Sequence, residues 1–204
     1  MNVSIYKNFK TNLGDKNILE VLNEIKSDKY NSDIQSIRYA LHKGEEKTAD
    51  EIKSSLLSFT TSGTFGESRT KTNIESYSQI LGLDFDHIPV AEINNLVTLI
   101  NSCEYTFASF ISPSGEGLKV FIKTNSNAEQ HSTAYNQVAN FYKELSGYDF
   151  DAKCKDITRL CFVSCDTELF INENAVIFEV KEEVKPLKSE PQKEVKHDLT
   201  TDEL

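Results

Sequence analysis

The chain has 204 residues, 38% of them hydrophobic and 10% aromatic, which is enough for one sizeable domain with a packed core. Its 32 acidic and 22 basic residues give a net charge of -10, which argues against a broad nucleic-acid-binding surface, so any contact with a polyanion needs a local basic patch or bound cations. No apolar run approaches a membrane span, and the first residues lack the apolar core of a signal peptide, so we expect a cytoplasmic protein without membrane contact.

The first third of the chain is predicted to contain one strand, three helices and an extended segment. Residues 3–9 read as a strand, and residues 17–27 and 33–41 carry apolar side chains at helical spacing. Thr48-Ala-Asp-Glu51 has the pattern of a capping box, which predicts the start of a short third helix. Residues 58–65 predict an extended polar segment with a turn. With Arg69, this segment offers groups that can touch a ligand, although scaffolding is the simpler interpretation.

The remaining elements alternate more regularly. They are predicted as strands at 78–86, 105–112, 118–123, 159–164, 168–171 and 175–180, with helices at 89–100 and 128–145. The pattern is that of one α+β domain. From residue 181 the sequence alternates Lys, Glu, Pro and Ser with few apolar residues, which predicts a disordered charged tail over 181–204.

Two aspartates in the predicted strand at 78–86 are the strongest functional signal. Asp84 and Asp86 stand two positions apart in an apolar run, so both side chains point to one face of the strand. An apolar strand rarely places two charges on one face without a cation. A divalent ion such as Mg²⁺ or Mn²⁺ is one justification, and a strand end where both aspartates meet solvent is the alternative.

A turn rich in serine and glycine follows the strand predicted at 105–112. The Ser112 and Ser114 hydroxyls can donate to a phosphate, and Gly115 and Gly117 allow backbone amides to approach it. Lys119, on the opposite side of the next strand from its apolar residues, can add a point charge. The alternative is an ordinary hairpin with an exposed lysine.

A second acidic group follows the long helix. Asp149 and Asp151 again stand two positions apart, and Asp156 and Arg159 lead into the next strand. A third carboxylate would complete a two-metal clamp, and Arg159 can grip phosphate oxygens with two parallel hydrogen bonds. Alternatively, Arg159 forms a structural ion pair with one of these aspartates.

Four cysteines remain, and they are interpreted as reduced thiols. Their spacing fits neither CxxC pairs nor the framework of a small secreted protein, so a zinc site is disfavoured. The cysteines are Cys103, Cys154, Cys161 and Cys165.

Taken in order, these groups resemble the catalytic core of the archaeo-eukaryotic primase superfamily, the primase-polymerases. In that superfamily an acidic pair and a later Asp bind metals, and the following hairpin binds the nucleotide. Residues 58–172 more closely resemble the VirE N-terminal-domain family of bacterial mobile elements. The resemblance is carried by four stretches, SGTF at 62–65, LDFD at 83–86, SPSGEGLK at 112–119 and TRLCFVS at 158–164.

The resemblance implies one α+β domain over residues 1–180, with a mostly antiparallel sheet packed by helices. It implies that Asp84, Asp86 and Asp151 are catalytic and bind Mg²⁺ or Mn²⁺, with Asp156 as the competing third carboxylate. Lys119 stands where many primase-polymerases have a His that contacts phosphate. The expected nucleotide- and phosphate-binding residues are Ser112, Ser114, Gly115, Gly117, Lys119 and Arg159.

The expected activity is metal-dependent nucleotidyl transfer in the replication of a mobile element. The expected partners are nucleoside triphosphates, a single-stranded or primed DNA template and a separate helicase, because helicase regions often follow such domains. Two alternatives remain open. One is a non-catalytic DNA-binding or replication-accessory module of the same fold, and the other is a metal-dependent nuclease.

Overall fold

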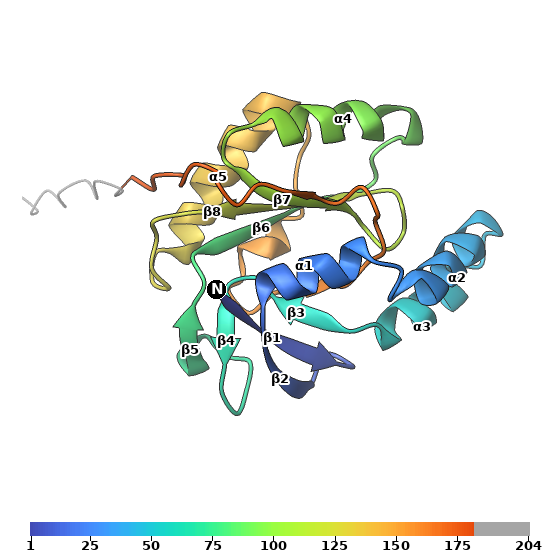
Figure 1. Cartoon of the computed structure of the whole chain (residues 1–204), viewed down its shortest axis with the longest axis horizontal. Helices are drawn as coiled ribbons and strands as arrows, with labels where there is room; N and C mark the ends of the chain where they lie inside the picture. Colours follow the sequence, from blue (N-terminus) through green and yellow to red (C-terminus); the bar gives the residue numbers. More distant parts are fainter. Residues whose placement is uncertain (182–204) are drawn as a thin grey trace, which may run out of the picture.

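Two four-stranded antiparallel sheets form the centre of the computed structural model, which describes residues 1–181 (Figure 1). The first sheet runs in the order β2-β1-β3-β9, with β1 (Asn2–Lys7), β2 (Thr11–Asn17), β3 (Ser58–Thr60) and β9 (Leu160–Phe162). The second sheet runs in the order β10-β7-β8-β6, with β6 (Ile80–Phe85), β7 (Thr106–Ile111), β8 (Leu118–Lys123) and β10 (Phe170–Ile171). A further pair joins β4 (Gly63–Phe65) to β5 (Ile74–Tyr77).

Helices cover the second sheet on one side and fill the space between the sheets on the other (Figure 1). Helices α4 and α5 lie on the outer side, whereas α1 lies between the two sheets. The helices and 3₁₀ turns are α1 (Ile18–Lys26), α2 (Asn31–His42), α3 (Glu46–Ser55), η1 (Lys71–Asn73), α4 (Val90–Ser102), α5 (His131–Ser146) and η2 (Ala152–Lys155).

The alternation of side chains on β6 and β8 separates two apolar cores. Leu83 and Val120 pack under α4 and α5, while Phe121 packs with Phe59 and α1 between the sheets. Asp84 and Lys119 are partners in the β6–β8 register and lie on the side of Phe121. This alternation therefore places two charged side chains inside the molecule, facing the first sheet.

The structure confirms an α+β fold with mostly antiparallel sheets, and it corrects two predicted elements. The capping box is wrong, because α3 already begins at Glu46 and Thr48 lies inside it. The strand expected at 175–180 is also wrong, since this segment forms only an isolated bridge from Phe178 to Thr124. Strands β2 and β5 were not predicted. The tail expected at 181–204 lies, apart from Lys181, outside the described residues. No helix within residues 1–181 has the length and apolar character needed to cross a membrane.

A buried histidine gives the fold a testable pH dependence. His131 is 4% exposed, its Nδ1 lies 2.9 Å from the Tyr77 hydroxyl, and its Nε2 has no hydrogen-bond partner. Burial lowers the pKa of His131 to about 4 from an ordinary value of 6.5, so the folded state resists protonation. The stability that neutral His131 contributes is complete above pH 6.5 and is lost as the pH falls towards 4.

We expect wild-type protein to lose about 2 kcal/mol more unfolding free energy between pH 7 and pH 5 than a His131→Gln variant does. Urea unfolding of both proteins at the two pH values measures this difference. Parallel losses in the two proteins would show that His131 is not the group that titrates.

Candidate metal and phosphate site

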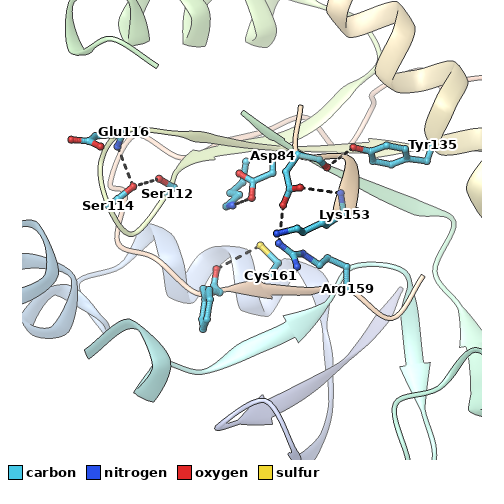
Figure 2. Close-up of polar contacts among 11 residues, drawn as sticks. Asp84, Ser112, Ser114, Glu116, Tyr135, Lys153, Arg159 and Cys161 are labelled. Atoms are coloured by element: carbon cyan, nitrogen blue, oxygen red, sulfur yellow. Dashed lines mark hydrogen bonds and ion pairs between the residues drawn. The ribbon is translucent and has the colours of Figure 1, made fainter. Parts of the chain in front are cut away.

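A polar cleft of about 320 Å³ brings together residues from distant parts of the chain. Its walls come from the β1–β2 turn, α3, β6, the β7–β8 turn and the segment that leads into β9. In Figure 2, Asp84 lies on one side and Arg159 on the other. The charged residues that line the cleft are Lys53, Arg69, Asp84, Asp86, Lys119, Asp156 and Arg159.

Asp84 is the deepest carboxylate in this cleft. It is 7% exposed, and its Oδ2 forms an ion pair with the Lys119 ammonium from the opposite strand. Its Oδ1 is buried and has no hydrogen-bond partner. A buried oxygen without a donor is unfavourable by about 1–3 kcal/mol, so this atom fits a site that a cation completes.

Burial and mutual attraction oppose each other in the Asp84–Lys119 pair. Burial raises the pKa of Asp84, and the Lys119 ammonium opposes that change. Burial disfavours the charged form of Lys119, but the neighbouring Asp84 carboxylate outweighs it and raises the pKa of Lys119. The ammonium therefore acts as the resident counter-ion of Asp84.

Asp151 is tied to Asp84 through the backbone. Its N–H donates to the Asp84 carbonyl oxygen at 3.1 Å, and its own carbonyl accepts from the Tyr135 hydroxyl at 3.0 Å. Its carboxylate caps η2 by accepting from the Lys153 N–H at 2.9 Å, and it pairs with Arg159 Nη2 at 2.8 Å. These bonds hold Asp151 beside Asp84, 67 positions earlier in the chain.

Cys154, predicted only as a reduced thiol, lies beside the two aspartates. One carboxylate oxygen each of Asp84 and Asp151 and the Cys154 Sγ lie within 4.8 Å of one another. Burial raises the pKa of the Cys154 thiol to about 12. The signal in the sequence that could have identified Cys154 was its position three residues after Asp151. Asp151 caps a 3₁₀ turn, in which side chains three positions apart lie on one side.

The other predicted carboxylates lie outside this cluster. Asp86 directly follows the last residue of β6 and is exposed, so only Asp84 of this pair is buried, although both aspartates line the cleft. Asp156 also lines the cleft, where its Oδ1 accepts from the Thr158 N–H at 2.9 Å. Asp149 points elsewhere and pairs with Lys143 at 2.5 Å, with its side chain 81% exposed.

The serine-glycine turn borders the cleft through its serines. Ser112 and Ser114 both line it, with their hydroxyl oxygens 3.0 Å apart. The Gly115 N–H donates to the Ser112 carbonyl at 3.0 Å and so belongs to the turn itself. A Cβ at Gly117 would lie 2.5 Å from the Phe85 carbonyl oxygen, so only glycine lets the turn pass this close to β6.

Two basic residues at the site were not predicted. Arg38 of α2 donates from Nη2 to the Ser112 carbonyl at 3.3 Å and supports the turn from behind. Lys53 of α3 lines the cleft. Basic residues on amphipathic helices ordinarily face solvent, so the sequence carries no signal that separates these two from the others. Arg69, noted as a possible ligand contact, also lines the cleft and donates to the Thr158 carbonyl.

The family model described as "BT4734-like, N-terminal domain" matches residues 51–170, more than half of the chain. This range includes Asp84, Lys119, Asp151 and Arg159, whereas the β1–β2 turn lies outside it. No curated protein and no solved structure matches the chain.

Proposed function

The chain belongs to the BT4734-like N-terminal domain family, and we propose that it is a metal-dependent nucleotidyl transferase of the primase-polymerase type. The proposal extends the resemblance of its motifs to the VirE N-terminal-domain family and the archaeo-eukaryotic primases. One observation carries it above all others. Asp84 has a buried carboxylate oxygen without a partner, and the Asp151 carboxylate lies beside it.

The two carboxylates fit a divalent cation of the hard type. Asp84 and Asp151 would hold Mg²⁺ or Mn²⁺, and Asp86 lines the same cleft as Asp84. The Cys154 thiol is a poor ligand for such ions, so the carboxylates would carry the binding. When bound, the metal would neutralise the triphosphate and lower the pKa of an attacking hydroxyl.

The remaining polar residues would position the triphosphate. Arg159 and Lys119 would face its oxygens, and the Ser112 and Ser114 hydroxyls would donate to it from the turn. In the transfer, the 3′-oxygen of a primer bonds to the α-phosphorus as the bond to pyrophosphate breaks, and the hydroxyl proton passes to solvent. Lys119 would exchange its contact with Asp84 for one with phosphate.

The partners follow from this chemistry. We infer that the substrates are nucleoside triphosphates and a single-stranded or primed DNA template, that the protein acts in the cytoplasm during replication of a mobile element, and that a separate helicase supplies the template strand.

The direct test is incorporation of dNTPs or NTPs on a primed template with Mn²⁺, using wild type, Asp84→Ala and Asp86→Ala. Incorporation that both substitutions abolish supports the proposal. Strand cleavage that they abolish would instead make the protein a nuclease. Wild type that leaves the primer unextended and uncut would contradict both activities.

A non-catalytic DNA-binding or replication-accessory module is the second candidate. It is favoured by the two ion pairs, because Lys119 and Arg159 already neutralise Asp84 and Asp151 without a metal. In that case the protein would bind DNA with equal affinity in Mn²⁺ and in a metal-free buffer.

Arg159→Lys is expected to raise the apparent KM for the nucleotide about tenfold. Lysine keeps the charge but lacks the planar fork that contacts two phosphate oxygens at once. Nucleotide titration of the incorporation rate measures this change. Arg159 is exposed, so the thermal midpoint should stay within a few degrees of wild type. A lower midpoint with an unchanged KM would assign Arg159 a purely structural role.

A further inference from the structure

The β1–β2 turn places an aromatic ring at the mouth of the cleft. Phe9 is 42% exposed and lines the cleft together with Phe162 of β9. The two rings meet edge to face, with their centroids 5.4 Å apart. The exposed ring of Phe9, braced by the partly buried ring of Phe162, offers a flat apolar surface to a flat ligand beside a polar cleft.

The backbone of this turn shows that folding alone does not favour a phenylalanine here. The Lys10 N–H donates to the Lys7 carbonyl at 3.3 Å, and the two residues between have positive φ angles, 53° at Asn8 and 62° at Phe9. This is the geometry of a type I′ turn, whose second central position favours glycine. A bulky side chain in the left-handed region is disfavoured, so the turn itself does not account for a phenylalanine at this position, and a binding role for the ring would.

Two cations flank the aromatic pair without carboxylate partners. Lys53 Nζ lies 5.8 Å from the centre of the Phe162 ring, and Arg69 Nη2 donates to the Phe9 carbonyl at 3.3 Å. Across residues 1–181, neither cation forms an ion pair, and Arg69 Nε is buried without a hydrogen-bond partner. In a chain of net charge -10, two unneutralised cations beside an aromatic pair favour a ligand with a flat base and phosphates.

We propose that Phe9, Phe162, Lys53 and Arg69, the rim platform, bind a single-stranded polynucleotide by stacking one base on Phe9 and holding neighbouring phosphates on the two cations. The inference rests on the proposed function, for which it supplies a site for the template or primer strand. Stacking on an aromatic ring tolerates any base, so the platform needs no sequence preference.

Part of the platform is separate from the groups assigned to the triphosphate, although Phe162 lies three residues after Arg159, which is one of those groups. Ser112, Ser114 and Lys119 come from β8 and the turn before it, whereas Phe9 and Lys53 come from the β1–β2 turn and α3. One cleft therefore offers two anion-binding walls, one beside Asp84 and one at its mouth. This arrangement suits a strand that ends at the acidic cluster.

The absence of tryptophan from the chain allows a direct test. In full-length Phe9→Trp protein the new indole is the only one, and a base stacked on it quenches its fluorescence. We expect oligothymidylate of about a dozen nucleotides to quench this emission in a metal-free buffer with EDTA. The matched control is Leu13→Trp, because Leu13 is 53% exposed on the same hairpin but does not line the cleft. Its emission should not change.

Each comparison ligand has a defined outcome. An abasic oligonucleotide of equal length should not quench, because it lacks the base. Equal quenching in the Leu13→Trp control or by the abasic strand would overturn the proposal. Quenching by dTTP at the same nucleotide concentration would also overturn it, since the platform would then hold the incoming nucleotide and not a strand.

Two substitutions separate stacking from folding. Phe9→Ala and Phe9→Gly should both weaken binding of a labelled oligothymidylate about tenfold, the loss expected for one stacked base. Phe9→Gly should melt above Phe9→Ala, because glycine relieves the left-handed conformation. Wild-type affinity in Phe9→Gly protein would overturn the platform.

The cations predict a change in salt dependence. Lys53→Ala should make the slope of log K against log salt less steep by about 0.7 unit, the value for one phosphate contact with a single strand. An unchanged slope would remove Lys53 from the platform. These binding measurements need no metal. If the protein binds oligothymidylate through the platform but incorporates no nucleotide, the proposed function is contradicted and the platform is not.

Discussion

Replacing Asp84 with Asn is expected to reduce Mn²⁺-dependent nucleotide incorporation by about three orders of magnitude. The substitution keeps the size of the side chain but removes the charge that would hold the metal, and a bound metal supplies several kcal/mol to the transition state. Single-turnover extension of a labelled primer measures the effect, because it reports the chemical step apart from product release.

Asp149→Asn is the matched control for this substitution. Asp149 and Asp151 share the same short acidic sequence, but Asp149 is exposed and pairs with Lys143 away from the cluster. The control should keep wild-type incorporation within about twofold, since exposed ion pairs contribute little. An Asp84→Asn protein that extends primers at a rate near that of the control would contradict a metal-binding role for Asp84.

Replacing Lys119 with Met is expected to lower the free energy of unfolding by about 3 kcal/mol in a metal-free buffer. The loss follows because Asp84 would keep a buried charge without a partner. Mn²⁺ should restore most of that loss, because a bound ion takes the place of the ammonium and a concentration one hundred times the Kd contributes about 2.7 kcal/mol. Urea unfolding with and without Mn²⁺ measures both effects.

Lys123→Met tests whether the effect is specific to the buried pair. Lys123 lies on the same strand, four positions after Lys119, and donates to the Glu173 carbonyl. Its loss should lower the unfolding free energy by less than about 1 kcal/mol, with no recovery in Mn²⁺. Equal recovery in both variants would mean that Mn²⁺ binds elsewhere on the protein.

Local patterns in the sequence were sufficient for most elements of the fold. Apolar patterns predicted the helices and the strands around the serine-glycine turn, because α4 buries one face and β7 and β8 are buried along most of their length. The short strand β5 escaped because its four residues are only partly buried or exposed. The capping box at Thr48 failed because α3 begins two residues earlier, at Glu46, without a side-chain cap.

The site was only partly predictable because its residues meet through tertiary contacts. The resemblance to the primase-polymerases pointed to Asp84 and Asp151, which the structure brings together, and to Arg159, which pairs with Asp151. The exposure of Asp86 depends on where β6 ends. The strand was predicted to include residue 86, but it ends at Phe85. Arg38 and Lys53 reach the cleft through the packing of α2 and α3, and no spacing along the chain records that packing.

Because Lys119 neutralises Asp84 in the folded protein, the protein does not need a bound metal in order to fold. Small zinc domains unfold when chelated because metal binding supplies much of their folding free energy. Here an amino group built into the chain already balances the deepest acid. The protein should therefore keep its native fold during purification in chelating buffers, and the proposed metal would bind to the folded protein afterwards.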